Sequence, residues 1–189
     1  EDKKGNIWIA TDYGLNVYNP NNGRFKVYLR DEKNVNTIRN NNVFFVFVDS
    51  KGIVWIKTLR FLEKLNPRNN IVKHYEHYFD IFNSNPEHVN YPIFEDSQGL
   101  IWVATNDGLN YFDTEFEQFV RFESNDKSST ALPNNQVRCI YENKHHELWI
   151  GTSNGFCRFN RTKKTFETFY YLGNNRGKNI VNGIVEDDN

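Results

Sequence analysis

The sequence lacks methionine, has only two cysteines, and shows no excess of charge of either sign. Its 23 lysines and arginines balance 24 aspartates and glutamates, which argues against the broad basic surface typical of nucleic-acid-binding proteins. No run approaches the roughly 18 apolar residues of a membrane span, so we expect no membrane contact by this segment. An N-terminal signal segment is also absent, and the first residues already follow the pattern of the middle of a folded domain. We therefore expect the chain to be a piece of a longer protein.

Aromatic residues and asparagine are, by contrast, abundant. The 16 phenylalanines, 10 tyrosines and 4 tryptophans supply a core of flat, bulky side chains. Asparagine occupies 29 of the 189 positions, and because asparagine favours turns the composition suits a turn-rich all-β protein. Helical periodicity is absent throughout the sequence.

A repeat of 47 residues organises the chain. It is marked by four evenly spaced tryptophans, Trp8, Trp55, Trp102 and Trp149. A threonine follows each tryptophan by three residues, at Thr11, Thr58, Thr105 and Thr152. A glycine precedes three of them by three residues, at Gly5, Gly52 and Gly99, and His146 takes this place in the fourth. A fixed period of this length indicates a repeat architecture.

Each repeat is predicted to contain four short antiparallel strands. The first is an apolar run, found at Val43–Val48, Tyr91–Glu95, Val137–Glu142 and Ile180–Val185. A tight turn that begins with aspartate or asparagine leads to the tryptophan strand. Such repeats predict β-propeller blades, because the repeats of a β-helix or solenoid are shorter. The recurring tryptophans and phenylalanines are then core residues between blades.

The predicted fold is therefore all-β, a segment of about four four-stranded antiparallel blades with a 47-residue repeat. We treat residues 1–189 as a single partial propeller. The blades are placed at 1–30, 43–76, 90–122 and 137–170. Residues 180–186 are predicted to be the innermost strand of a further blade or a strand that closes the ring.

The repeat resembles a known family. The pattern D-x-x-G-x-[ILV]-W-[IV]-x-T-x-x-G-L-x-x-[FY]-[DN], most complete over Asp96–Asp113, is similar to the two-component regulator propeller repeat. The copy at Asp2–Asn19 also matches closely. The copy at Asp49–Asn66 departs at Phe61, and the copy at Asn143–Asn160 begins with asparagine and has histidine in place of the first glycine. These departures affect local turn geometry, and the resemblance covers essentially the whole chain. It implies that the chain is part of a larger propeller of about seven blades.

The resemblance implies a sensory function. Repeats of this family fill the periplasmic sensor regions of hybrid two-component systems of Bacteroidetes, whose parents are anchored in the inner membrane. It implies that the parent protein binds oligosaccharides released from glycans and relays the signal to a histidine kinase outside this chain. Because propellers host enzymes, scaffolds and receptors alike, this expectation rests on the resemblance and not on the fold. The alternative is a non-catalytic scaffold that docks another protein or a second copy.

The sequence contains no pattern typical of a catalytic, cofactor or metal site. The paired acids Glu1-Asp2, Glu95-Asp96 and Glu186-Asp187 recur at one repeat position, as turn caps do, whereas catalytic carboxylates face one another across a bond. His74 and His77 are three apart in a predicted strand and so point to opposite faces, which disfavours a metal site. We predict that this chain is not an enzyme and has no cofactor. A propeller glycosidase or lyase is the enzymatic alternative.

The candidate ligand surface follows from propeller topology. The linkers between consecutive blades emerge on the same face as the turns between second and third strands, and we call this the loop face. Sugars are bound by aromatic rings together with amide, carboxylate and guanidinium groups. Candidate residues of this kind are Tyr13, Arg39, Arg60, Phe61, Tyr78, Phe79, Asn106 and Asp107. The alternative for each of them is a structural role in its loop.

Two further expectations concern the cysteines and the chain's outer blades. Cys139 and Cys157 are predicted on the first and third strands of one blade, about 9–10 Å apart. A disulfide needs Cα atoms within about 7 Å, so both are predicted to be free thiols. Unpaired strand edges and apolar blade faces invite association with the remaining blades of a parent ring or with a second copy. Pairing of Ile180–Val185 with Asn6–Thr11 is one way to cover these edges.

Overall fold

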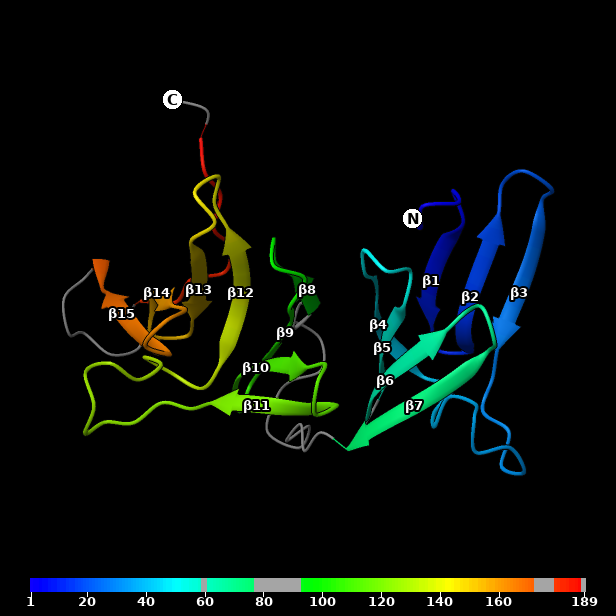
Figure 1. Ribbon diagram of the computed structural model, residues 1–189, viewed down its shortest axis with the longest axis horizontal. Helices are drawn as coiled ribbons and strands as arrows, with labels where there is room; N and C mark the ends of the chain where they lie inside the picture. The colour runs from blue at the N-terminus through cyan, green and yellow to red at the C-terminus, as the bar shows by residue number, and fades with distance from the viewer. Residues whose placement is uncertain (59–60, 77–92, 172–178, 188–189) are drawn as a thin grey trace. The chain divides into compact units, whose positions relative to one another are not determined.

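The computed structural model describes residues 1–58, 61–76, 93–171 and 179–187. This part of the chain contains fifteen strands and no helix, and every pairing between strands is antiparallel (Figure 1). The strands form four sheets in which neighbours in sequence are neighbours in space. The predicted all-β class and antiparallel blades are therefore confirmed. The chain divides into two compact units, Glu1–Tyr78 and Phe79–Asn189, and each is described by itself.

The first unit contains blades 1 and 2. Blade 1 has three strands, β1 (Ile7–Thr11), β2 (Gly14–Asn19) and β3 (Arg24–Tyr28). Blade 2 has four, β4 (Val43–Val48), β5 (Val54–Thr58), β6 (Phe61–Asn66) and β7 (Ile71–Glu76). Leu15 of blade 1 packs with Val54, Ile56 and Leu65 of blade 2, and all four are fully buried. Apolar burial between facing sheets therefore holds the two blades together.

The second unit contains blades 3 and 4. Blade 3 consists of β8 (Ile93–Glu95), β9 (Ile101–Thr105), β10 (Gly108–Asp113) and β11 (Gln118–Phe122). Blade 4 consists of β12 (Val137–Glu142), β13 (Leu148–Thr152), β14 (Gly155–Asn160) and β15 (Thr165–Phe169). Trp102 and Leu109 of blade 3 share a core with Ile150, Phe159 and Phe166 of blade 4. The aromatic core predicted between blades is therefore present here.

The recurring aspartate and tryptophan are joined by a hydrogen bond. In the first three blades the indole Nε1 of Trp8, Trp55 and Trp102 donates to Oδ2 of Asp2, Asp49 and Asp96 at 3.0, 3.0 and 2.8 Å. The other carboxylate oxygen accepts backbone N–H groups of the turn, as predicted for a turn cap. Gly5, Gly52 and Gly99 take φ of 79°, 79° and 76°, and His146 takes 61° at the same place. One acid thus shapes the turn and orients the core tryptophan.

The recurring threonine closes the second turn. The hydroxyls of Thr11, Thr105 and Thr152 donate to the carbonyls of Gly14, Gly108 and Gly155 at 2.7–2.8 Å. Each hydroxyl also accepts a backbone N–H from within its turn. In blade 2, where Phe61 replaces the glycine, the distance from Thr58 Oγ1 to the Phe61 carbonyl is 3.5 Å. The threonine is therefore a structural residue of the loop face.

Both cysteines are free thiols, as predicted. Cys139 lies on β12 and Cys157 on β14, and β13 separates them in the sheet. Burial raises the pKa of both thiols, most strongly that of Cys157 in the core of the second unit. Cys157 is thus a small apolar core residue, whereas Cys139 is half-buried.

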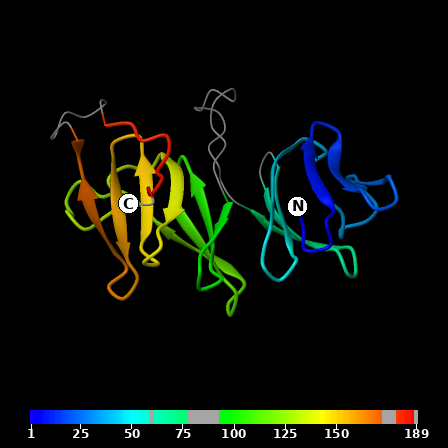
Figure 2. The same ribbon diagram turned by 90° about the horizontal axis from the view of Figure 1, so that it is seen from above.

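The predicted innermost strand at Ile180–Val185 is not a strand in the structure, because it pairs with no strand in the described ranges. The segment nevertheless runs beside blade 4, as Figure 2 shows for its red trace. Gly155 N donates to Asn179 O at 2.6 Å, and Val181 N donates to Thr152 O at 2.9 Å. Asn41 and Asn135, which precede β4 and β12, accept the same bond from Gly14 and Gly108. That residues 180–186 begin a further blade or close a ring stays a prediction.

Candidate functional site

Backbone hydrogen bonds bring the linkers and the second turns together on the loop face. The carbonyls of Asn41 and Asn135, near the ends of their linkers, accept the N–H of Gly14 and Gly108 at 2.6 and 2.8 Å. The side-chain Oδ1 of the same asparagines accepts the N–H of Arg30 and Ser124, at the starts of the linkers, at 2.7 and 2.6 Å. Each asparagine therefore fastens both ends of its linker, which accounts for part of the asparagine excess.

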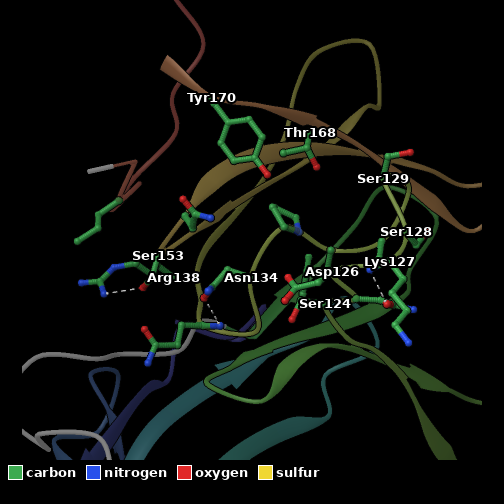
Figure 3. A pocket seen from close by; sticks show the side chains of 17 residues that line it. Ser124, Asp126, Lys127, Ser128, Ser129, Asn134, Arg138, Ser153, Thr168 and Tyr170 are labelled. Atoms are coloured by element: carbon green, nitrogen blue, oxygen red, sulfur yellow. Dashed lines mark hydrogen bonds between the residues drawn. The ribbon is translucent and has the colours of Figure 1, made fainter. Parts of the chain in front are cut away.

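A polar hollow of about 1100 Å³ lies on the loop face of blade 4. Its walls come from the β11–β12 linker, the start of β12, the β13–β14 turn and the end of β15 (Figure 3). Its polar lining includes Ser124, Asp126, Lys127, Ser128, Ser129, Asn134, Gln136, Arg138, Ser153, Asn154, Thr168 and Tyr170. We call this cavity the blade 4 hollow.

The walls of the blade 4 hollow are anchored to the blade. Leu132, in the middle of the linker, is buried in the core of the second unit. Phe166 N on β15 donates to Thr130 O at 2.8 Å, and Ser153 N donates to Gln136 O at 3.0 Å. The linker is thus held against the outermost strand and against the second turn. A cavity with anchored walls needs little ordering when a ligand binds.

The lining chemistry suits a polyhydroxylated ligand. Serine, threonine and tyrosine hydroxyls both donate and accept, and the asparagine and glutamine amides do the same. Tyr170 adds an aromatic ring that is 39% exposed. Arg138 is oriented by two contacts, Nε to Asn182 Oδ1 at 2.8 Å and Nη1 to Ser153 Oγ at 3.3 Å. Among the described residues, no three histidine, cysteine or acidic side chains are placed to hold a metal ion.

None of the eight predicted ligand residues lines the blade 4 hollow. Arg60, Tyr78 and Phe79 lie outside the described residues. Tyr13 is 70% exposed on the β1–β2 turn, so its ring is accessible. Asn106 and Asp107 form the β9–β10 turn, and Asp107 Oδ2 is paired with Arg121 Nη2 at 2.6 Å. The described candidates are therefore spread over three blades, and their role in binding stays a prediction.

Arg39 and Phe61 surround a buried acid of blade 2. The backbone N–H of Arg39 donates to Oε1 of the fully buried Glu63 at 2.7 Å. His74 lies beside them, with Nδ1 3.5 Å from the same oxygen and Nε2 2.9 Å from the carbonyl of Val35. The ring of Phe61 meets that of His74 edge-on. Glu63 and His74 thus hold the linker of the first unit, while the Arg39 side chain stays exposed.

The sequence predicted the loops of the hollow but not its residues. The linker and the β13–β14 turn were expected on the loop face from topology alone. Arg138, Thr168 and Tyr170 belong to strand ends, and only the packing of the linker against β15 brings them to the same cavity. The run of serines from Ser128 is the one local signal that marks the hollow's polar lining.

Together, the four sheets and the loop face define this chain as a segment of a β-propeller. Residues 84–107 and 131–154 match the family model of the two-component regulator propeller. These two segments thus match the family that the sequence pattern resembles. No curated protein matches the chain.

Solved structures agree with this assignment. A structure described as the extracellular domain of a hybrid two-component system from B. thetaiotaomicron is 26% identical, with a TM-score of 0.66 over 89% of this chain. The chain spans 22% of that domain's length. Virginiamycin B lyase from Staphylococcus aureus is 18% identical, with a TM-score of 0.63, over 93% of this chain and 55% of the lyase. At this identity the likeness shows the fold alone. PorZ of the Porphyromonas gingivalis type-IX secretion system also shows the fold alone. It is 12% identical, with a TM-score of 0.59, over 87% of this chain and 25% of PorZ.

The neighbour from B. thetaiotaomicron is consistent with an extracytoplasmic place for the chain. The extracellular domain from B. thetaiotaomicron shares both the fold and a quarter of the aligned residues. Within the described ranges there is no helix that would span a membrane. The likeness to a lyase shows that the fold by itself does not separate sensors from enzymes.

Proposed function

We propose that this chain is part of a periplasmic sensor region that binds a glycan-derived oligosaccharide and relays the signal to a histidine kinase outside the chain. The observation that carries the proposal is the 26% identity to the extracellular domain of a hybrid two-component system over 89% of the chain. The blade 4 hollow supports it, because a cavity lined by hydroxyls, amides and one exposed aromatic ring suits a sugar. The relay acts through blades and domains of the parent, without catalysis in this segment.

A thermal-shift screen with a panel of neutral oligosaccharides tests the proposal. A ligand that binds the folded chain stabilises it by RT ln(1 + [L]/Kd), which is about 2.7 kcal/mol at a hundredfold excess over Kd. We expect Tyr170→Ala to remove the shift and Tyr13→Ala to retain it. The opposite pattern would move the site to the Tyr13 turn. A panel with no shift in the wild-type chain would contradict the proposal, and turnover of a glycan would replace it with an enzymatic function.

A second candidate function, association through blade 1, is favoured by a specific observation. On blade 1, Ile7, Ile9 and Phe25 are 38%, 37% and 64% exposed. The residues at the same repeat positions of blade 4, Leu148, Ile150 and Phe166, are 0%, 0% and 4% exposed because blade 3 covers them. Blade 1 therefore presents an apolar face of the kind that another blade covers elsewhere.

Light scattering of the 22.4 kDa chain tests this association. We expect a concentration-dependent increase in mass, because the apolar face is buried between copies, and we expect the double variant Ile9→Ser/Phe25→Ser to stay monomeric. Val35→Ser is the matched control, since Val35 is 67% exposed but lies on a linker. A wild-type chain that stays monomeric at every concentration would contradict the second candidate.

A further inference from the structure

A second cavity, away from the loop face, lies between blades 1 and 2. It measures about 910 Å³ and is lined by the turn before β1, by β3, by the β4–β5 turn and by the β6–β7 turn. Antiparallel pairing puts these turns at the blade ends opposite the loop face. Six lining residues are basic, namely Lys3, Lys4, Arg24, Lys26, Lys51 and Arg68. We call this cavity the basic groove.

The charges of the basic groove are not neutralised within it. Asp2 is its one acidic lining residue. Burial alone would raise the pKa of Asp2, but hydrogen bonds from Asn6, Trp8 and Lys4 outweigh it and lower the pKa. That carboxylate is thus fully engaged with its own turn and tryptophan. Within the described ranges none of the six basic side chains forms an ion pair. The groove therefore attracts anions.

The repeat itself shows that the fold does not require these charges. Between blades 3 and 4, the positions of the six basic residues are held by Ser97, Gln98, Gln118, Val120, His145 and Thr162. The same turns and strands form there although none of these six positions holds a lysine or an arginine. The basic residues of those turns stand at other positions, Lys144, Arg161, Lys163 and Lys164. In that place Arg161 reaches across to Asp96 Oδ2 at 2.6 Å, whereas Pro67 holds the corresponding position beside the basic groove. Basic residues at these six positions are therefore specific to the first unit.

Aromatic rings line the same groove. Trp8 and Tyr28 stack with ring centroids 5.8 Å apart, and both are half-buried. Lys26 Nζ lies 4.3 Å from the centroid of the Tyr28 ring and 2.5 Å from Asn70 Oδ1 on blade 2. Aromatic faces beside cationic groups can pack against a sugar ring while its anionic substituents pair with the cations.

We propose that the basic groove binds an oligosaccharide that carries sulfate or carboxylate groups. Charge complementarity selects the anionic groups, and the Trp8–Tyr28 pair selects a sugar ring. The proposal takes its saccharide class from the proposed function, but the groove is a different site from the blade 4 hollow. A single-stranded nucleic acid also combines phosphates with stacked bases. The saccharide is preferred because the proposed function supplies that ligand class, and the titration below includes an oligonucleotide as the competing ligand.

Calorimetric titration of the 189-residue chain tests the groove. The probes are sulfated dextran oligosaccharides, oligogalacturonate and neutral dextran of equal length. We expect the first or the second to bind and the third not to bind at the groove. The affinity should fall as salt rises from about 0.05 to about 0.5 M, because screening weakens exposed charge pairs over this range. Tighter binding of oligothymidylate than of either anionic saccharide would overturn the assignment to a saccharide.

Matched variants locate the binding. Lys4→Gln/Arg24→Gln/Lys51→Gln removes three exposed charges of the groove and should weaken binding about tenfold, since three exposed ion pairs are lost. Lys33→Gln/Lys144→Gln/Lys163→Gln removes three exposed charges that lie outside both the groove and the blade 4 hollow, and it should leave the affinity within about twofold of wild type. An equal loss in both triple variants would overturn the site. Tyr170→Ala should not affect this binding, so failure of the groove and failure of the loop-face site are distinguishable.

Discussion

Replacing Trp102 by alanine is expected to destabilise the second unit by about 3–5 kcal/mol, the usual cost of truncating a buried aromatic residue to alanine. Trp102 is fully buried between blades 3 and 4 and contacts the rings of Phe122 and Phe159 at centroid distances of 6.4 and 5.2 Å. The change also deprives the buried Asp96 of the indole N–H at 2.8 Å. The cavity left by the indole and the lost hydrogen bond to Asp96 therefore both lower the stability of the second unit.

Hydrogen exchange on the whole chain measures this effect for each unit. We expect amides of β9–β15 to lose protection in Trp102→Ala, while amides of β1–β7 keep theirs. Trp149→Ala is the matched control at the same repeat position, because Trp149 is only half-buried on blade 4. Its loss of protection should be clearly smaller. Equal losses in the two variants would mean that burial between blades does not determine how much each tryptophan stabilises the second unit.

The blade architecture was predictable because the same residue pattern recurs in four copies along the chain. Aspartate, glycine, tryptophan and threonine recur at set distances, and each makes the same local contacts wherever the pattern is intact. Such contacts join residues two to six apart, so sequence spacing carries them. The hydrogen bond from the indole to the aspartate was not predicted. The constant spacing of six residues, as between Asp96 and Trp102, was a signal that could have indicated it.

The candidate sites were less predictable because they depend on what differs between repeats and on which linker packs where. The blade 4 hollow joins Ser128 of a linker to Tyr170 at the end of β15, more than forty positions away along the chain. The basic groove could not be predicted from the net charge, because a total near zero does not show that basic residues cluster in one part of the fold. Aligning repeats by charge as well as by apolar pattern would have separated Lys4 and Lys51 from Gln98 and His145.

The departures from the repeat have structural substitutes where the turn is still needed. His146 adopts φ of 61° in place of glycine, and Asn143 accepts the N–H groups of His145 and Glu147 as aspartate does elsewhere. Asn143 Nδ2 donates to Glu147 Oε2 at 2.8 Å. Hydrogen bonds from Asn143 and Arg158 lower the pKa of Glu147. The fourth turn thus keeps its shape with a different set of side chains.

Replacing Arg161 by alanine is expected to destabilise the contact between blades 3 and 4 by about 3 kcal/mol, the lower end of the cost of breaking a buried ion pair from one side. Arg161, on the β14–β15 turn of blade 4, donates to Asp96 Oδ2 at 2.6 Å and to Glu142 Oε1 at 2.8 Å. The side chains of Asp96 and Glu142 are 0% and 9% exposed, so two carboxylates would be left poorly compensated. Ser97 still donates to Glu142, which limits the loss.

Arg158→Ala is the matched control for this prediction. Arg158 also bridges two acids, Glu147 at 2.5 Å and Glu167 at 2.7 Å, but its side chain is 40% exposed, against 21% for Arg161. Because solvent and salt screen exposed pairs, its removal should change the unfolding free energy little. Denaturant unfolding followed by exchange of the β9–β15 amides gives both values. The double variant Arg161→Ala/Glu142→Gln should recover part of the loss, because one of the two uncompensated charges is then gone. Equal effects of Arg158→Ala and Arg161→Ala, or no recovery in the double variant, would show that the buried pairs do not hold the two blades together.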